Sequence, residues 1–281
     1  MTKNSLWLFI AEIMPKSVIS YVTKRIMLSE NKYVKKAAKA FIFHMSKVDL
    51  TDAKEKNYHN YDGPMDLFLR DLDMSTRPIE KSDNILISPV DAKVAELGEI
   101  TETGLIGVKG NQYPVSELVD CEANAREYIG GSYMVLWLQL KDYHFIHSPV
   151  TGDIRYARVI PGALLPVLPE ALDKYPNLLS KNERVVTWVN NNVFGEVAVV
   201  KVGAASVGSI DTEYDPDLRT DGNSKLTRTE TYDNLRVEKG AKLANFRLGS
   251  TVVLLLKEGK IKPSVSVGED VLLGQSLYIS E

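Results

Sequence analysis

A glycine and a serine near the end of this 281-residue chain could react with each other and cleave the chain between them. Gly249 and Ser250 come directly before an apolar run at 252–256. The serine hydroxyl could attack the glycine carbonyl, because glycine has no Cβ to block the approach. The ester formed can break by β-elimination, which leaves dehydroalanine as the new N-terminal residue. Its hydrolysis releases ammonia and leaves a pyruvoyl ketone. Taken alone, the dipeptide also fits an ordinary turn into a strand, so the chemistry requires partners.

Histidine and aspartate residues that could serve as partners occur in two other short segments. A serine hydroxyl is a weak nucleophile until a base takes its proton, and histidine is the usual base. Two of the four histidines, His144 and His147, lie in the segment 142–149, just after a strand-like run. Asp91, in the segment 88–94, could orient such a base. Asp91, a histidine and Ser250 would then follow the logic of a catalytic triad, which is recognised by roles rather than by position.

Six short elements of the chain together resemble one enzyme family over nearly the whole length. They are Pro89-Val90-Asp91, Asp142-Tyr143-His144-x-x-His147-x-Pro149, Asn182-Glu183-Arg184-Val185, Val202-Gly203-Ala204, Val207-Gly208-Ser209-Ile210 and Phe246-x-Leu248-Gly249-Ser250-Thr251. In these elements the chain resembles the phosphatidylserine decarboxylases of the bacterial type I-like kind. Members of that family are pyruvoyl-dependent enzymes made as self-processing proenzymes. One departure is Ala92, where relatives often have glycine. We interpret it as a modest change in a turn.

The resemblance implies a role for each candidate residue. His147, oriented by Asp91, would activate Ser250 for cleavage at Gly249-Ser250, giving a β chain of residues 1–249 and an α chain of residues 250–281. Ser250 would become the covalent pyruvoyl cofactor. The enzyme, a carboxy-lyase, would convert phosphatidylserine to phosphatidylethanolamine and CO2 through a Schiff base, with His144 as proton donor. The family pattern also implies a homodimer. Spacing alone does not separate the roles of the two histidines.

Composition and motifs argue against several other classes of site. The single Cys121 rules out an internal disulfide and a cysteine-clustered metal site. We find no glycine-rich phosphate loop and no paired histidines on a helix, so the expectation is no metal and no nucleotide. Hydrophobic residues make up 44% of the chain and charged residues 25%, which favours a folded core over disorder. The β-rich part is acidic overall, so nucleic-acid binding is not expected.

The N-terminal region is basic and has apolar faces at helical spacing. Residues 1–50 contain nine lysines and arginines against three acidic residues, a charge of +6, which leaves −9 for the remainder of a chain with net charge −3. Helices are expected over about 5–14, from 17 onward and over 33–46, with Val34, Ala38, Phe41 and Met45 on one side and Lys39 largely elsewhere. No apolar run approaches the roughly 20 residues that span a bilayer, and the segment fits a signal peptide poorly.

Two interpretations of these helices remain open. They could simply pack on the β-rich part. Alternatively, residues 1–80 form a membrane-associating region whose apolar side chains enter the headgroup boundary while its lysines meet anionic lipid. The second interpretation suits an enzyme with an anionic lipid substrate. It predicts a peripheral membrane protein on the cytoplasmic face of the cell membrane, with phosphatidylserine and an anionic membrane surface as partners.

From about residue 81 to 281 the chain consists of short apolar runs separated by turn residues. Strands are expected at 105–108, 135–140, 185–189, 197–202, 252–256 and 271–279, and a surface loop with a possible gating role at 212–240. The segment 88–94 has an echo at 148–154, and with 267–277 these turns resemble hammerhead hairpins of biotinyl domains. The predicted fold class is therefore α+β: amphipathic helices followed by a mainly antiparallel β sandwich or barrel with hammerhead-like hairpins.

Two other functions fit parts of the pattern. A conventional serine hydrolase would use Ser250, His147 and Asp91 on an external ester, but the chain lacks the Gly-x-Ser-x-Gly turn of that class at Ser250. An uncleaved and active polypeptide would favour it. A non-catalytic membrane-binding protein is the other alternative, and the intact Gly-Ser-Thr element and both histidines argue against it.

Overall fold

The computed structural model describes residues 25–27, 29–165, 167, 177–204, 209–220, 225–247 and 250–281. The predicted helix at 5–14, the part of the next helix before residue 25, and Gly249 of the proposed cleavage site lie outside the described residues. The helices are α3 (Lys32–Ser46), α4 (Pro64–Phe68), α5 (Val115–Val119), α6 (Glu122–Arg126) and α8 (Leu178–Lys181), with 3-10 turns at Tyr58–Asn60 and Met74–Thr76. No described helix is both long and apolar enough to cross a membrane.

Helix α3 confirms the third predicted N-terminal helix, but its buried face differs from the predicted one. The Asn31 side chain caps its first turn by accepting from the backbone N–H groups of Tyr33 and Val34. Lys39 is buried because its Nζ donates to the carbonyl oxygens of Tyr58 (3.2 Å) and Tyr61 (2.5 Å). The prediction that Lys39 lies away from the packed side was therefore wrong. Phe41 and Met45 are exposed instead.

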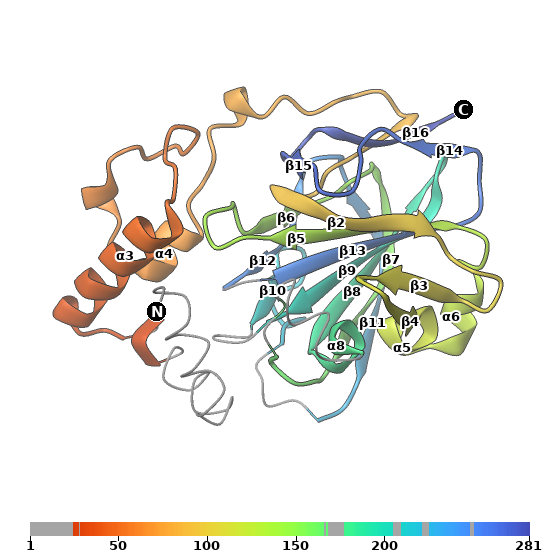
Figure 1. The fold of residues 1–281 in the computed structure, drawn as a ribbon, viewed down its shortest axis with the longest axis horizontal. Helices are drawn as coiled ribbons and strands as arrows, with labels where there is room; N and C mark the ends of the chain where they lie inside the picture. Colours follow the sequence, from red (N-terminus) through yellow and green to blue (C-terminus); the bar gives the residue numbers. More distant parts are fainter. Residues whose placement is uncertain are drawn as a thin grey trace.

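An eight-stranded sheet forms the main body of the protein, and its strand order is β11-β7-β8-β9-β13-β5-β2-β15. Two three-stranded sheets, β1-β16-β14 and β10-β12-β6, and the hairpin β3-β4 complete the β structure (Figure 1). The strands are β1 (Ile85–Ile87), β2 (Ala92–Glu99), β3 (Leu105–Val108), β4 (Asn111–Pro114), β5 (Ser132–Leu138), β6 (Phe145–His147), β7 (Gly152–Ile160), β8 (Arg184–Asn191), β9 (Gly195–Gly203), β10 (Ile210–Thr212), β11 (Arg228–Val237), β12 (Lys242–Phe246), β13 (Ser250–Leu256), β14 (Ile261–Pro263), β15 (Asp270–Val271) and β16 (Ser276–Ser280).

The described strands confirm an α+β fold with antiparallel sheets but form no closed barrel. Every ladder between two of the named strands is antiparallel. Strands β11 and β15 end the large sheet and do not pair with each other. The barrel alternative was therefore wrong, whereas the sandwich and its hammerhead-like hairpins stay predictions.

Alternating side chains of the central strands fill two separate cores. In β13, Val252 and Leu254 enter a core that also contains side chains from both three-stranded sheets, such as Ile146 of β6 and Leu277 of β16. Val253 lies in the other core, on the opposite face of the sheet, together with residues of β3, β4, α5 and α8. A central strand buried on both faces reads as a continuous apolar run, which explains why the sequence shows β13 so clearly.

The predicted strands correspond to β3, β5, β8, β9 and β13, and the run at 271–279 divides into β15 and β16. The predicted surface loop at 212–240 was wrong in one respect, because ten of its residues form β11. This strand lies at the edge of the large sheet, and among the described strands its one partner is β7. Most of its side chains are exposed or half-buried, so it carries none of the apolar alternation by which strands are recognised.

The sequence echo between 88–94 and 148–154 corresponds to a matching set of hydrogen bonds. Ser88 Oγ donates to the Val90 carbonyl, and Ser148 Oγ donates to the Val150 carbonyl, both at 2.6 Å. Two equivalent backbone hydrogen bonds also join the two turns. Ile87 N donates to the Pro149 carbonyl at 3.1 Å, and His147 N donates to the carbonyl of its counterpart Pro89 at 2.8 Å. The chain thus repeats one local structure twice, and the repeats face each other.

Each turn of this repeat is closed by a glycine in the left-handed region. Gly274 N donates to the Ser88 carbonyl and Gly240 N to the Ser148 carbonyl, at 3.0 and 2.8 Å. The φ angles of these glycines are 91° and 81°, which other residues rarely adopt. Because the backbones match, the polar side chains that differ between the repeats stand out. Asp91 corresponds to Thr151, and His147 corresponds to the apolar Ile87.

Candidate active site

Ser250 is the first residue of β13 and is completely buried. Its cross-strand partners are Leu138 at the end of β5 and Gly203 at the end of β9. Its Oγ has no hydrogen-bond partner among the described residues, and the same is true of Thr251 Oγ1. A buried hydroxyl without a partner costs free energy, so its presence in a central strand requires an explanation.

Asn182 and Glu183, which belong to one of the six motif elements, lie beside the end of β9, a partner strand of Ser250. Asn182 Nδ2 donates to the Gly203 carbonyl at 2.8 Å, and Gly203 N donates to the Glu183 carbonyl at 2.9 Å. The Glu183 side chain is buried and accepts a bond of 2.7 Å from Thr220 Oγ1. A Cβ added to Gly203 would lie 3.3 Å from Glu183 Cγ. A buried carboxylate therefore lies against the residue that faces Ser250.

His144 is bonded to the chain segment before Ser250 and to the residue that follows the neighbouring strand β5. Its backbone carbonyl accepts from Phe246 N (2.9 Å), four residues before Ser250. Its Nε2 lies 3.1 Å from the carbonyl of Gln139, the residue after Ser250's partner Leu138. A carbonyl only accepts, so Nε2 bears the proton and Nδ1 is a lone pair, which is buried and unpartnered within the described residues. The ring packs on Phe68 of α4, with centroids 4.1 Å apart.

The environment of His144 keeps it neutral. Burial, with a smaller contribution from the nearby charge of Arg70, lowers its pKa to about 3. Arg70 is itself buried, and its guanidinium donates to the carbonyl oxygens of Lys141 (2.8 Å) and Asp142 (3.4 Å) in the loop before His144. In the intact chain His144 therefore offers an unprotonated Nδ1.

His147 closes β6 and has a partner at each ring nitrogen. Nδ1 lies 2.6 Å from the Gly240 carbonyl and Nε2 lies 3.1 Å from the Tyr143 hydroxyl. The carbonyl fixes the proton on Nδ1, so Nε2 accepts from Tyr143 O–H. Burial, with a smaller contribution from the neighbouring charge of Lys242, lowers the pKa of His147 to about 4. His147 is therefore a neutral base whose lone pair is held by Tyr143.

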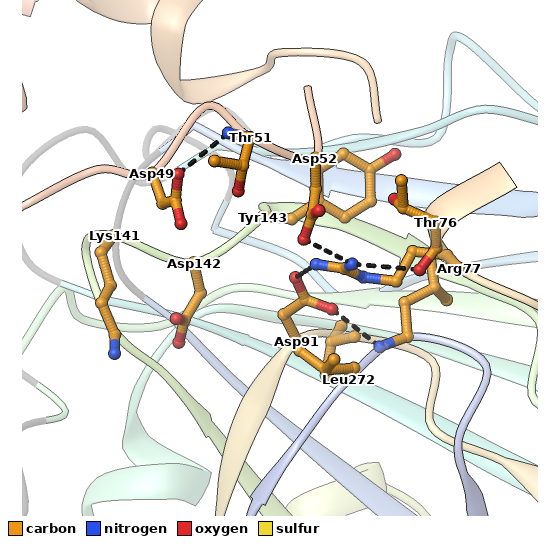
Figure 2. A network of polar contacts seen from close by, with 12 residues as sticks. Asp49, Thr51, Asp52, Thr76, Arg77, Asp91, Lys141, Asp142, Tyr143 and Leu272 are labelled. Carbon is orange, nitrogen blue, oxygen red and sulfur yellow. Dashed lines mark hydrogen bonds and ion pairs between the residues drawn. The ribbon is translucent and has the colours of Figure 1, made fainter. Parts of the chain in front are cut away.

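Asp91 is buried on the turn that faces His147, but its carboxylate has other partners. Oδ1 accepts from the backbone N–H of Leu273 at 2.7 Å, and Oδ2 lies 3.2 Å from Arg77 Nη2 (Figure 2). The backbone of His147 bonds that of Pro89, two residues before Asp91. The structure thus brings Asp91 and His147 onto facing turns. Of the described contacts, none is a hydrogen bond between their side chains.

Three residues of this site were not singled out from the sequence. Tyr143 and Glu183 stand within the quoted motifs, whereas Arg77 lies outside them. A buried arginine cannot be told from an exposed one without its partners, so Arg77 carried no signal. Tyr143 stands beside His144, and its position before a histidine pair was the available clue. Across the described part of the chain, no group of three or more His, Cys, Asp or Glu is arranged to hold a metal ion.

Comparison with known proteins gives the family. A family model described as phosphatidylserine decarboxylase matches residues 65–279. A phosphatidylserine decarboxylase proenzyme of Brevibacillus brevis is 37% identical over 230 residues, covering 81% of this chain and 82% of the relative. One from Saccharophagus degradans is 30% identical over 283 aligned residues, covering 99% and 98%. One from an Anaeromyxobacter species is 37% identical over 234 residues, covering 82% of each. The chain therefore belongs to the phosphatidylserine decarboxylase family and is a decarboxylating enzyme, a carboxy-lyase.

Proposed function

We propose that this chain cleaves itself between Gly249 and Ser250 and then decarboxylates phosphatidylserine to phosphatidylethanolamine with a pyruvoyl group derived from Ser250. The observation that carries the proposal is the buried, unpartnered hydroxyl of Ser250 at the start of a central strand. Its relatives are named proenzymes, which agrees with processing. The products would be a β chain of residues 1–249 and an α chain of residues 250–281.

In maturation, His147 takes the proton of Ser250 while Ser250 Oγ attacks the Gly249 carbonyl. Burial keeps His147 neutral above a pKa of about 4, so its basic form dominates near neutral pH. The Gly240 carbonyl holds the ring in the tautomer that leaves Nε2 free of a proton. Tyr143 must release Nε2 before that nitrogen can accept a new proton. Asp91, on the facing turn, stabilises the positive charge that His147 then bears.

In turnover, the pyruvoyl carbonyl would bind the amine of the lipid headgroup and accept the electron pair left when CO2 departs. His144 donates the proton that replaces CO2. To do so its Nδ1 must first gain a proton, which its pKa of about 3 in the intact chain opposes. Cleavage releases a carboxylate at Gly249, one residue before Ser250, and a nearby negative charge favours the protonated histidine. Maturation would thereby prepare His144 for its role.

The remaining parts of the proposal concern the surroundings of the enzyme. Residues 1–80 form a membrane-associating region and residues 81–281 the catalytic β-rich part. The protein binds the anionic surface on the cytoplasmic face of the cell membrane, where its lipid substrate lies, and it acts as a homodimer. The basic charge of residues 1–50 and the exposed Phe41 and Met45 of α3 support the membrane contact.

The decisive experiment is an intact-mass spectrum of the purified protein under denaturing conditions, with assay on phosphatidylserine vesicles. We expect fragments 1–249 and 250–281, with the smaller one lighter by one ammonia than a peptide that begins with serine. Ser250→Ala should stay whole and inactive. Thr251→Val is the matched control, because Thr251 is also buried with an unpartnered hydroxyl, and it should still be cleaved. A single uncleaved wild-type chain that remains active on vesicles would overturn the proposal.

A further inference from the structure

We propose that Arg77 is a positioning residue for self-cleavage, which holds Asp91 as an oriented, charged carboxylate beside His147. This inference rests on the proposed function. Arg77 lies after the 3-10 turn Met74–Thr76, outside the β sheets and outside the recognised motifs. It is nevertheless buried, with 7% of its surface exposed. A buried guanidinium requires partners, and those of Arg77 are specific.

The Arg77 guanidinium lies between two carboxylates and forms an ion pair with each. Its Nη1 lies 2.6 Å from Asp52 Oδ2, and its Nη2 lies 3.2 Å from Asp91 Oδ2. Figure 2 shows the guanidinium between these two side chains, with the Asp91 carboxylate turned toward it. Nη1 also donates to the Thr76 carbonyl at 3.3 Å, which fixes the end of the side chain. The Asp91 side chain is only 11% exposed, so water cannot readily replace Arg77.

The internal repeat shows what Arg77 adds at this position. Thr151, the counterpart of Asp91, accepts from the N–H of Lys239 at 3.0 Å, just as Asp91 Oδ1 accepts from the N–H of Leu273. Closing the turn therefore needs one side-chain oxygen, which threonine supplies as well as aspartate. The second oxygen of Asp91 is not needed for the turn. It is the oxygen that binds Arg77, so the ion pair is the feature that distinguishes the Asp91 turn.

The charges around Asp91 explain why a cation is needed there. The charged and titratable groups near it are Arg70, Arg77, Asp142, Tyr143 and His147. The Arg70 guanidinium donates to the carbonyl oxygens of the loop at 141–142. The two ring nitrogens of His147 are bonded to Gly240 and Tyr143 rather than to Asp91. Without Arg77, Asp91 would be a buried carboxylate bonded by one N–H group. Such a group favours its protonated form, which cannot stabilise a positive His147.

The test is the pH dependence of self-cleavage, followed by intact mass on precursor made by cell-free synthesis. For Arg77→Gln we expect cleavage at least tenfold slower at neutral pH, recovering as the pH rises because the unpaired carboxyl then ionises. Arg77→Lys keeps a cation with one contact, so the acid limb of its profile should lie between those of wild type and Arg77→Gln. Asp52→Asn is the matched control, since it leaves the Arg77–Asp91 pair in place and should keep the wild-type profile.

Four results would overturn the proposal. Arg77→Gln with the wild-type profile means that the ion pair has no part in cleavage. If the cleavage rate of Arg77→Gln is lowered equally at every pH, the effect of the substitution is purely structural. The same holds if the pH profile of Asp52→Asn is displaced as far as that of Arg77→Gln. If Arg77→Gln does not fold, Arg77→Lys decides, because an unshifted acid limb contradicts the proposal. Failure of the proposed function looks different, since wild type would then remain uncleaved in the same assay.

Discussion

The two histidines of the site carry their protons on opposite ring nitrogens, and this difference supports separate roles for them. His144 Nε2 donates to the Gln139 carbonyl, so the lone pair of His144 is on Nδ1. His147 Nδ1 donates to the Gly240 carbonyl, so the lone pair of His147 is on Nε2. They also stand in different places: His144 is bonded to the segment before Ser250 and to the residue that follows β5, and His147 faces the turn of Asp91. The site therefore has two distinct positions for a proton, which suits an enzyme with separate maturation and turnover steps.

Single histidine variants test this division. We expect His147→Ala to remain uncleaved, because Ser250 then lacks its base. His144→Ala should be cleaved at close to the wild-type rate but lose decarboxylation by a factor on the order of 100 or more, the usual contribution of general acid catalysis. The measurement is intact mass for cleavage and phosphatidylethanolamine formation for turnover. If His144→Ala blocks cleavage while His147→Ala matures, the roles are reversed, and the contacts of His144 around Ser250 would then explain why.

In the proposed maturation, the low pKa of His147 gives cleavage a defined pH dependence. Only the neutral ring can take the proton of Ser250, and it is neutral above a pKa of about 4. The rate of wild-type cleavage should therefore be nearly constant from pH 6 to 8, about two or more units above that pKa, and should fall as the pH approaches 4. A time course of intact mass at each pH measures it. An acid limb centred near 6.5, the ordinary histidine pKa, would show that the ring is not desolvated in the reacting chain.

Lys201 is a completely buried lysine on β9, two residues before Gly203. Its Nζ donates to Thr187 Oγ1 (2.6 Å) and to the Val199 carbonyl (3.1 Å), with no carboxylate among the partners that the structure describes. Burial lowers its pKa from 10.5 to about 7. As the pH falls from 10.5 toward 7, the unfolded chain takes up a proton that the folded chain does not. The free energy of unfolding therefore decreases over this range and levels off below about pH 7.

Lys201→Met should remove this dependence. Between pH 8 and 10 the wild-type free energy of unfolding should rise by up to about 1.4 kcal/mol per pH unit more than that of the variant. Urea denaturation of both proteins in a Ser250→Ala background, where no cleavage intervenes, measures the difference. Lys260→Met, at an exposed position, is the control and should leave the wild-type slope. Equal slopes for wild type and Lys201→Met would show that Lys201 stays charged in the folded chain.

At the scale of elements, the sequence predicted what periodicity and buried runs can show. Strands β8, β9 and β13 are buried on both faces and have continuous apolar runs, so their positions were recognised. Edge strand β11 was not, because its exposed side chains look like a loop. The burial of Lys39 in α3 was also missed, since it depends on two carbonyl oxygens from the segment at 58–61. The motif residues were found from the sequence, but the partners of Asp91 depend on tertiary contacts.

The internal repeat provides a matched test of packing at the two turns. Gly152 begins β7 where a Cβ would lie 2.3 Å from the Asn190 carbonyl oxygen, so Gly152→Ala must push β7 away from β8. At its counterpart Ala92, the same strand position already contains a Cβ. We expect Gly152→Ala to destabilise by about 1–3 kcal/mol and Ala92→Gly by about 0.5–1 kcal/mol.

Urea denaturation in the uncleaved Ser250→Ala background compares the two variants. A cost for Gly152→Ala no larger than that for Ala92→Gly would mean that the β7–β8 contact adjusts easily. The comparison also bears on the departure of Ala92 from its relatives. If Ala92→Gly costs little, this turn accepts either residue, as the interpretation of a modest change requires.

At the scale of the whole molecule, the N-terminal region is fastened to the catalytic part through several charged contacts. Lys242 of β12 bonds Asp71 at 2.6 Å, Arg70 bonds the loop before His144, and Arg77 bonds Asp91. Apolar contacts join the same parts, since Leu72 packs with Tyr143 and Phe145. Figure 1 shows α3 and α4 beside the β body, at the end where β6 and β12 lie. A membrane bound by this region would therefore lie near the catalytic end of the protein.

The exposed face of α3 gives this arrangement a direct test. Tyr33, Phe41 and Met45 are 73%, 52% and 59% exposed, and their spacing of four or eight residues places them along one stripe of the helix. Exposed Lys32 and Lys36 lie on the same helix. Apolar side chains at a headgroup boundary with lysines nearby are what an anionic surface binds.

The double variant Phe41→Ser, Met45→Ser should bind vesicles of phosphatidylserine and phosphatidylcholine at least several-fold more weakly than wild type in sedimentation assays. It should still cleave itself, because neither side chain is buried. Leu226→Ser, at a position 78% exposed and distant in sequence from α3, is the control and should bind normally. Raising the salt concentration should weaken wild-type binding, since the lysines contribute through screened charge. Equal binding by the double variant and wild type would mean that α3 only packs against the rest of the protein and that another part of the chain binds the membrane.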